Sequence, residues 1–339
     1  PPGILWPVEA NGYDVLEYHL ACPREYFEAG RIAFLPHNIY SNFPFNMEML
    51  YFLLMILRGD PLQAAISAQI LHVGVGILAV AAIWLVGRTI SSRAGFIAVI
   101  LAASTPVFFS LSSLAYVESG LVFFAAMAMA TILRSSEGGE NSKDKWIFLS
   151  GMFAGLACGC KYIAVPCLLL PLTIAPFFTH QKRSRAVFRF LFGAAITFSP
   201  WLIKNAVMTG NPIFPLARST FTERPGVWTT DGAKRWREGH LPDPADRATT
   251  ARCAKFAMLV FAGADYGLLP VLAFISIVAF VLFRHPFAIP CLFVFIAVTI
   301  TWTFFTHLIG RFAILLIPPA CLLVGMAFDR FSYFNALRS

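Results

Sequence analysis

Apolar residues fill most of this chain in long blocks, and short polar islands separate the blocks. Residues 63–86 form the first block that is long enough, at about 1.5 Å per helical residue, to cross a hydrocarbon core about 30 Å thick. We predict further membrane spans at 94–112, 117–133, 147–163, 164–179, 188–204, 266–284, 286–304 and 311–328. The pattern predicts an all-α, polytopic transmembrane helical bundle, with one further span expected ahead of the first residue.

Two stretches interrupt the apolar pattern. Residues 1–60 mix aromatic and charged residues at helical spacing, with prolines as breakers, which predicts short amphipathic helices lying at the membrane face. Residues 205–265 are rich in Gly, Pro and charge and predict a long extramembrane loop. We therefore divide the chain into a first outer loop (1–60), a set of spans (61–204), a second outer loop (205–265) and C-terminal spans with a short inner tail (266–339).

The composition supports a membrane protein. Of 339 residues, 58% are hydrophobic and only 13% are charged, and the mean hydropathy is +0.70, far from the values of soluble domains. In such a chain the net charge of +8 sets orientation, and we expect no nucleic-acid partner because no basic stretch is interleaved with stacking aromatics. Most of the seven cysteines lie in apolar runs, and only Cys22 and Cys253 are placed where they could pair.

The distribution of Lys and Arg predicts the orientation of the spans. If residues 1–60 lie outside, the inner loops hold Arg88, Arg93, Arg134, Lys143, Lys145, Lys182, Arg183, Arg185, Arg189, Arg284, Arg330 and Arg338, as the positive-inside rule requires. Nearly all residues of chemical interest then lie on the outer side.

Ionisable residues next to apolar spans are costly and therefore indicate function. The outer acids Asp14, Glu48 and Glu118 are candidates for catalysis. The outer cations Lys161, Lys204 and Arg311 lie at span ends, where they could reach a phosphate headgroup. Acids and phosphate-binding cations on one membrane face suit a reaction on a lipid-linked phosphate.

A structural interpretation remains open for each candidate. The acids could be solvated helix-surface residues, the lysines could be anchors whose stems lie in lipid, and His19 could be a structural hydrogen-bonding partner. Two other classes also stay open, namely a secondary transporter and a catalytically silent membrane protein. A structure that gathers Asp14, Glu48 and Arg311 around one cavity would separate these classes.

Several motifs occur in a fixed order along the chain. They are Tyr13-Asp14, Tyr18-His19-Leu20, GRI (30–32), SNFPFNMEMLY (41–51), GCKYIAVP (159–166), SPWLIKNAVMTGNPIFPLA (199–217) and GRFAILLIPP (310–319). Together they make the chain resemble the superfamily C membrane glycosyltransferases, in particular the bacterial enzymes similar to protein mannosyltransferases and to the lipid A aminoarabinose transferase.

The resemblance implies an enzyme that moves a hexose or pentose from a polyprenyl-phosphate donor to a lipid, glycan or protein acceptor, with inversion. It implies that Asp14 acts as the base, that Glu48 and Glu118 support catalysis, and that the substrates are bound by Tyr18, His19, Lys161, Lys204, Asn205 and Arg311. This chain departs from the mannosyltransferase pattern of two adjacent acids, because Val15 follows Asp14, and Glu17 therefore competes for the role of base.

The same resemblance predicts an integral protein of a bacterial inner membrane, with the site on the periplasmic face. We expect no required cofactor, because a polyprenyl phosphate is already a fair leaving group. A divalent metal bound by Glu48 with His19, His37, His240 or His307 is conceivable, but the spacing of these residues matches no metal motif.

Overall fold

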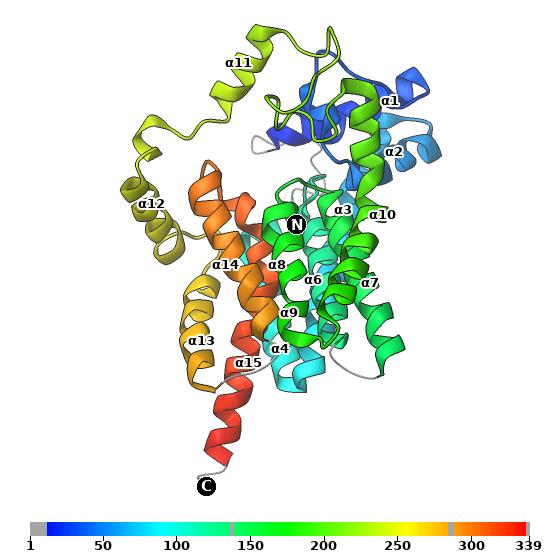
Figure 1. The fold of residues 1–339 in the computed structure, drawn as a ribbon. Coiled ribbons are helices and arrows are strands. Elements are labelled where there is room, and N and C mark those ends of the chain that lie inside the picture. Colours follow the sequence, from blue (N-terminus) through cyan, green and yellow to red (C-terminus); the bar gives the residue numbers. More distant parts are fainter. Residues whose placement is uncertain (1–11, 136–138, 284–287, 337–339) are drawn as a thin grey trace.

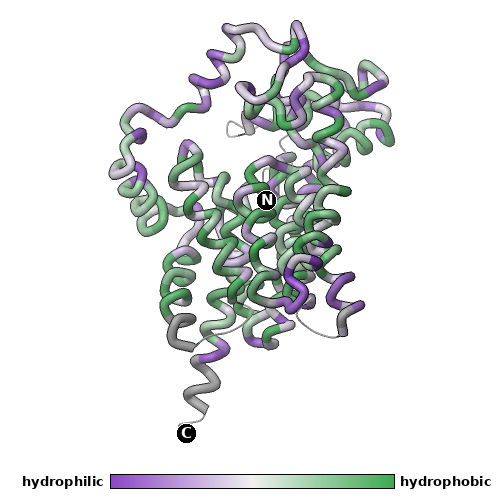
Figure 2. Tube along the Cα trace, in the orientation of Figure 1, coloured by the Kyte–Doolittle hydropathy of each residue, from purple (hydrophilic) through white to green (hydrophobic). Residues whose placement is uncertain are grey.

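The computed structural model describes residues 12–135, 139–283 and 288–336. Within these ranges the chain consists of helices and loops without any strand, which confirms the all-α prediction. Figure 1 shows an elongated helical bundle with a cap of shorter helices and loops at one end, formed by the first outer loop and part of the second. Figure 2 shows that the bundle is mainly hydrophobic and that hydrophilic residues gather in the cap and at the opposite end.

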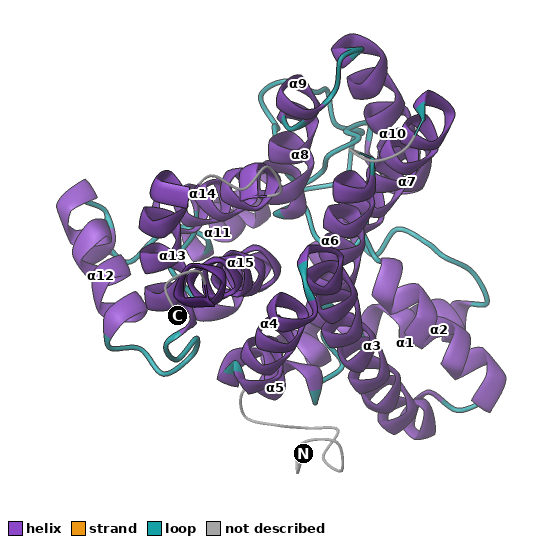
Figure 3. Cartoon of the chain, turned by 90° about the horizontal axis from the view of Figure 1, so that it is seen from below, coloured by secondary structure: helices purple, strands orange, loops and turns teal. Residues whose placement is uncertain are grey.

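Long helices form the bundle. The first, α3 (Pro61–Ile90), begins where the side chain of Asp60 accepts hydrogen bonds from the N–H groups of Leu62 and Gln63 at 2.8 and 3.3 Å, with Pro61 at its first position, a favourable helix start. The others are α6 (Glu118–Arg134), α7 (Glu140–Cys158), α10 (Arg183–Thr209), α13 (Leu269–Phe283), α14 (Ala288–Phe305) and α15 (Ile317–Ala336), which follows the 3₁₀ helix η6 (Gly310–Leu316). Figure 3 shows α15 between α4 (Ser92–Ser104) on one side and α13 and α14 on the other.

Fewer helices reach full membrane length than the sequence predicts. Among the described residues, four helical segments are long and apolar enough to cross a membrane: Pro61–Ile90, Arg183–Thr209, Ala288–Phe305 and Gly310–Arg330. A fifth is added if a bent pair of helices counts as one span. Nine full spans are therefore not found within the described residues, although helical segments occur in all nine places.

Two predicted spans contain proline and differ from a full-length straight helix. The predicted span 94–112 is divided into α4 and α5 (Pro106–Ser112), which meet at 64°. Thr105 precedes Pro106 and has an extended backbone, as expected because the proline ring disfavours the helical conformation of the preceding residue. The predicted span 164–179 contains three prolines and consists of η4 (Val165–Leu169), α8 (Leu170–Ile174) and α9 (Pro176–Thr179), which follow one another as a single short apolar helix, Val165–Phe178.

The interface between α7 and α10 depends on small residues. A Cβ atom at Gly151 would lie 1.9 Å from the carbonyl oxygen of Phe190, and one at Gly155 would lie 2.4 Å from the carbonyl oxygen of Ala194. The spacing Gly-x-x-x-Gly places both glycines on one helix face, where it allows two backbones to approach closely. The C-terminal half of α7 is thereby held close to α10.

The first outer loop contains η2 (Val15–His19), α1 (Ala21–Ala29), η3 (Ile39–Asn42) and α2 (Asn46–Arg58), which confirms the predicted short helices. Asn46 fastens α2 to the bundle, because its Nδ2 donates to the carbonyl of Leu156 at 2.9 Å and its Oδ1 accepts from Nε1 of Trp201 at 2.8 Å. The first outer loop is therefore a folded part of the molecule with defined contacts to α7 and α10.

The second outer loop contains α11 (Thr230–Gly239), η5 (Pro244–Asp246) and α12 (Thr249–Phe261). Its start is later than predicted, because α10 continues to Thr209 and ends at Gly210 in the left-handed conformation. All seven cysteines are free: Cys22 is buried and Cys253 is exposed. The pairing of these two cysteines that the sequence left open is therefore not found.

Candidate active site

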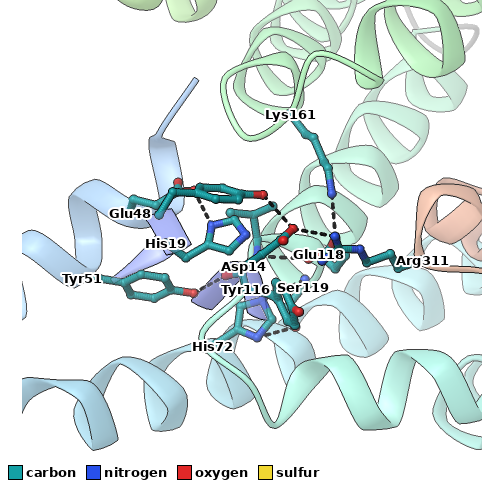
Figure 4. A network of polar contacts seen from close by, with 12 residues as sticks. Asp14, His19, Glu48, Tyr51, His72, Tyr116, Glu118, Ser119, Lys161 and Arg311 are labelled. Carbon is teal, nitrogen blue, oxygen red and sulfur yellow. Dashed lines mark hydrogen bonds and ion pairs between the residues drawn. The ribbon is translucent and has the colours of Figure 1, made fainter. Parts of the chain in front are cut away.

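Four charged residues from distant parts of the sequence meet at the capped end of the bundle. Asp14 lies just before η2, Glu118 begins α6, Lys161 follows α7, and Arg311 lies in η6. Figure 4 shows Asp14, Glu118, Lys161 and Arg311 next to one another, within a network of polar contacts. We refer to these four residues as the charged cluster.

Asp14 is held by two donors. Nη2 of Arg311 lies 2.5 Å from Oδ2 of Asp14, and the hydroxyl of Tyr18 donates to the same oxygen at 3.1 Å. The side chains of Asp14 and Arg311 are each 18% exposed, so the ion pair is shielded but not sealed from solvent. Burial, and then the Asp14 carboxylate, raises the pKa of Tyr18 well above its usual 10, which keeps this phenol protonated as a donor.

Glu118 is completely buried and has its own cation. Nζ of Lys161 donates to Oε1 of Glu118 at 2.9 Å, and the backbone N–H of Val117 donates to Oε2 at 3.1 Å. A buried carboxylate requires such partners, because a charge without them would lose its solvation uncompensated. The interpretation of Glu118 as an acid that faces water is therefore wrong.

Aromatic rings line the two cations. The guanidinium carbon of Arg311 lies 5.1 Å from the ring centre of Tyr116 and 5.5 Å from that of Phe312. Nζ of Lys161 lies 5.0 Å from the Phe312 ring. These distances suit cation–π attraction, so Phe312 contacts both cations and fixes their relative position.

The position of Arg311 also depends on the residue before it. A Cβ atom at Gly310 would lie 1.9 Å from Oδ2 of Asp265, and the carbonyl of Gly310 accepts a hydrogen bond from the hydroxyl of Tyr266 at 2.8 Å. The backbone at Gly310 is thus pressed against the end of the second outer loop. A larger residue at position 310 would require the carboxylate of Asp265 to move.

Glu48 lies on the other side of Asp14, away from the two cations, and forms a pair with His19 (Figure 4). Nδ1 of His19 and Oε1 of Glu48 are 2.7 Å apart, and both side chains are 1% exposed. Burial raises the pKa of Glu48 well above 4.5 and lowers that of His19 well below 6.5. Both directions favour the neutral forms, so the carboxyl of Glu48 keeps its proton and the imidazole of His19 takes up none.

Lys204 and Asn205 lie near the outer end of α10 and contact the first outer loop. Nζ of Lys204 donates to the carbonyl of Ser41 at 2.5 Å, and Nδ2 of Asn205 donates to the carbonyl of Asn42 at 2.8 Å. Both contacts are with backbone, and they hold η3 in place. The structure thus groups Lys204 and Asn205 with the first outer loop, apart from the charged cluster.

Three residues of this network were not among the sequence candidates. Tyr116 lies under Arg311, and its carbonyl accepts from the hydroxyl of Tyr51. His72 is fully buried within α3 and accepts the backbone N–H of Ser119 at Nε2, at 3.1 Å. A histidine in the middle of an apolar span was a usable signal for His72. Nothing in the sequence distinguishes Tyr116 or Tyr51 from other interfacial tyrosines.

The histidines that could have joined Glu48 in a metal site are dispersed. His19 contacts Glu48, whereas His37 lies 3.0 Å from Glu25, and the rings of His240 and His307 are 5.7 Å apart. In the part of the chain that the structure describes, no three His, Cys, Asp or Glu residues are grouped closely enough to hold a metal ion.

Comparisons with known proteins give a family match for part of the chain and structural matches for nearly all of it. Residues 44–203, just under half of the chain, match the model of the dolichyl-phosphate-mannose-protein mannosyltransferase family. No protein of curated function matches the chain by sequence. Solved structures, in contrast, match nearly the whole chain.

The similar structures include ArnT and an archaeal oligosaccharyltransferase. ArnT from Cupriavidus metallidurans bound to undecaprenyl phosphate has a TM-score of 0.66 at 16% identity, covering 93% of this chain and 55% of ArnT, and its apo form has a TM-score of 0.65 at 15% identity, covering 94% and 56%. The oligosaccharyltransferase AglB from Archaeoglobus fulgidus, in complex with an inhibitory peptide and a dolichol-phosphate, has a TM-score of 0.57 at 16% identity, covering 95% of this chain and 47% of AglB.

These matches confirm the resemblance that the motifs indicated: part of the chain matches a mannosyltransferase family, and nearly all of it has the fold of ArnT and AglB. Four described helical segments are also long and apolar enough to cross a membrane. The chain spans about half the length of the solved structures that it matches.

Proposed function

We propose that this chain is a membrane glycosyltransferase that moves a sugar from a polyprenyl-phosphate donor to an acceptor at the outer face of a bacterial inner membrane. The observation that carries the proposal is the charged cluster, in which two acids and two cations from four parts of the chain meet at one end of the bundle. The undecaprenyl phosphate in ArnT and the dolichol-phosphate in AglB support a lipid-phosphate donor.

Asp14 is the base in this proposal. Both of its described contacts, with Arg311 and with Tyr18, are made by Oδ2, which leaves Oδ1 to accept the proton of an acceptor hydroxyl. The acceptor oxygen then forms a bond to the anomeric carbon while the bond from that carbon to the phosphate oxygen breaks. The electron pair leaves with the lipid phosphate, and attack from the opposite side inverts the anomeric centre.

The two cations receive the negative charge of the departing phosphate. Arg311 and Lys161 both lie against Phe312, so they present their charges to one region, and fixed charges of this kind stabilise a leaving group without reorganisation. Glu118 would position Lys161, to which it is already bound. A donor phosphate that takes up Arg311 would also release Asp14 from its ion pair and free it to act as the base.

The test is sugar transfer by the full chain in lipid nanodiscs, with a pool of radiolabelled hexosyl and pentosyl polyprenyl phosphates as donors. We expect Asp14→Asn, which keeps the shape but loses the proton acceptor, to lower turnover by about 10²- to 10⁴-fold, the usual contribution of a general base.

Asp144→Asn is the matched control. It removes an acid that is 2.5 Å from Arg185 in a predicted inner segment, and it should leave turnover unchanged. Parental turnover in Asp14→Asn would exclude Asp14 as the base and would favour Glu17 for that role.

A further inference from the structure

A pocket of about 410 Å³ lies between the first and second outer loops. Its lining includes Tyr40 and Asn42 from the first loop and Trp228, Arg235 and Trp236 from the second. The volume falls in the range of about 300–1,000 Å³ that small-molecule sites occupy. None of the four residues of the charged cluster lines this pocket, so it is a separate site.

Aromatic rings form much of the pocket wall. The rings of Trp228 and Trp236 are 5.8 Å apart at 72°, and Trp228 in turn lies 5.2 Å from Phe214 at 65°. Trp236 is stacked on His240 at 4.3 Å, which fixes the plane of its ring. Rigid aromatic surfaces of this kind offer flat apolar area to a ligand at little cost in conformational entropy.

Two buried polar atoms at the pocket lack a partner. Within the described residues, neither Oδ1 of Asn42 nor Nε1 of Trp236 has a hydrogen-bond partner, and Asn42 is only 1% exposed. Such groups are costly when they stay unpaired. Both residues line the pocket, so a ligand whose entry shifts these side chains can donate a hydrogen bond to Asn42 and accept one from Trp236.

The pocket is linked to the candidate base through two stacked rings. Tyr40, which lines the pocket, stacks on Tyr18 with ring centres 5.0 Å apart and planes 24° apart. The hydroxyl of Tyr18 donates to Asp14 at 3.1 Å. A molecule in the pocket therefore lies on one side of the stacked Tyr40 and Tyr18 rings, and the Asp14 carboxylate is bound to the hydroxyl of Tyr18.

We propose that this pocket binds a sugar ring of a glycan acceptor, a role that rests on the function proposed above. A pyranose has a C–H face that packs on indole rings, and its hydroxyl groups both donate and accept hydrogen bonds. An acyl chain would leave Asn42 and Trp236 unpaired. Tyr40 and Tyr18 then separate the bound sugar ring from Asp14. The next sugar of the glycan extends past these two rings and brings its hydroxyl to Asp14.

The experiment measures sugar binding directly, without any donor. Saturation-transfer NMR on the full chain in nanodiscs would use methyl β-glucopyranoside, methyl α-mannopyranoside, methyl β-xylopyranoside and methyl N-acetyl-β-glucosaminide as probes, with sorbitol as a polyol that has no ring face. We expect at least one glycoside to bind, with the strongest transfer to protons of its C–H face, and sorbitol to give no signal.

Variants assign that binding to the pocket. Trp236→Ala and, from the opposite wall, Asn42→Leu should each weaken binding by about tenfold, whereas Trp236→Phe, which keeps a ring but loses the N–H, should have a smaller effect. Trp84→Phe is the control, because Trp84 lies in α3 beneath Arg88, outside the pocket lining.

The pocket assignment is overturned if no glycoside binds the parent, if sorbitol gives the same signal, or if Trp236→Ala and Asn42→Leu bind like the parent. These results are distinguishable from failure of the proposed function. Glycoside binding with unchanged turnover in Asp14→Asn would contradict only the catalytic assignment, whereas loss of turnover in Asp14→Asn without glycoside binding would contradict only the pocket.

Discussion

At the scale of single residues, the capped end of the bundle holds two kinds of shielded acid. Asp14 contacts Arg311 and Glu118 contacts Lys161. Glu48 instead contacts His19, a group that can be neutral. Since burying a charge costs several kcal/mol without a good partner, the first kind suits carboxylates that work as charges, whereas the second suits a hydrogen-bonded support.

The pair of His19 and Glu48 predicts how stability depends on pH. Burial holds the pKa of Glu48 well above 4.5 and that of His19 well below 6.5, so the folded pair binds one proton. The unfolded chain also binds one proton between about pH 4.5 and 6.5, two below this window and none above it. The contribution of the pair to the free energy of unfolding is therefore greatest within the window. It falls as the pH rises above 6.5, by up to about 1.4 kcal/mol per pH unit.

Thermal unfolding of the purified chain between pH 5 and 8.5 measures this dependence. In Glu48→Gln the group that retains the proton is gone, so the loss of stability above pH 6.5 should largely disappear. Glu25→Gln removes a surface acid that lies 3.0 Å from His37 and should leave the profile of the parent unchanged. A parental profile in Glu48→Gln would show that the pair does not carry the proton.

At the scale of helices, the sequence predicts where helices occur better than where they are interrupted. The apolar blocks correctly locate helices such as α3, α10 and α14, because any buried or lipid-facing helix needs such a block. The break at Pro106 follows from local chemistry and could have been predicted. The close approach of α7 and α10 brings Gly151 against Phe190, which is distant in the sequence. The sequence shows that residue 151 is small, but it does not show which helix packs against it.

This close approach predicts a sharp steric effect. Gly151→Val should destabilise the protein by about 1–3 kcal/mol or more, because the new side chain would meet the carbonyl of Phe190 and overpacked interfaces relax poorly. Thermal unfolding in detergent measures the loss. Gly74→Ala is the control, since a Cβ atom at Gly74 meets nothing within 4 Å, and an equal loss in both variants would contradict the proposed interface.

At the scale of the whole molecule, one orientation places the cap, the charged cluster and the pocket outside. This orientation comes from the distribution of Lys and Arg and predicts which cysteine is reachable. Cys253 in α12 is exposed and the other six cysteines are buried. A membrane-impermeant maleimide added to intact cells should therefore label the parent at Cys253, and Cys253→Ser should abolish the labelling. Labelling only in inverted membrane vesicles would reverse the orientation.

The sequence identifies the members of the charged cluster but not their arrangement. Asp14, Glu118, Lys161 and Arg311 are visible because charges at span ends are rare in an apolar chain. The sequence cannot show which acid meets which cation, because that depends on how helices pack. Lys204 illustrates the limit, since it has the same signature as Lys161 and yet contacts the carbonyl of Ser41 in the first outer loop.

The ion pair between Asp14 and Arg311 joins residues 297 positions apart in the sequence. At a synthesis rate of about 5–20 residues per second, Asp14 leaves the ribosome about 15 to 60 seconds before Arg311. Throughout that interval the newborn first loop has a carboxylate that lacks its counter-ion. The charged cluster can therefore be completed only after Arg311 has been synthesised, when nearly all of the chain has left the ribosome.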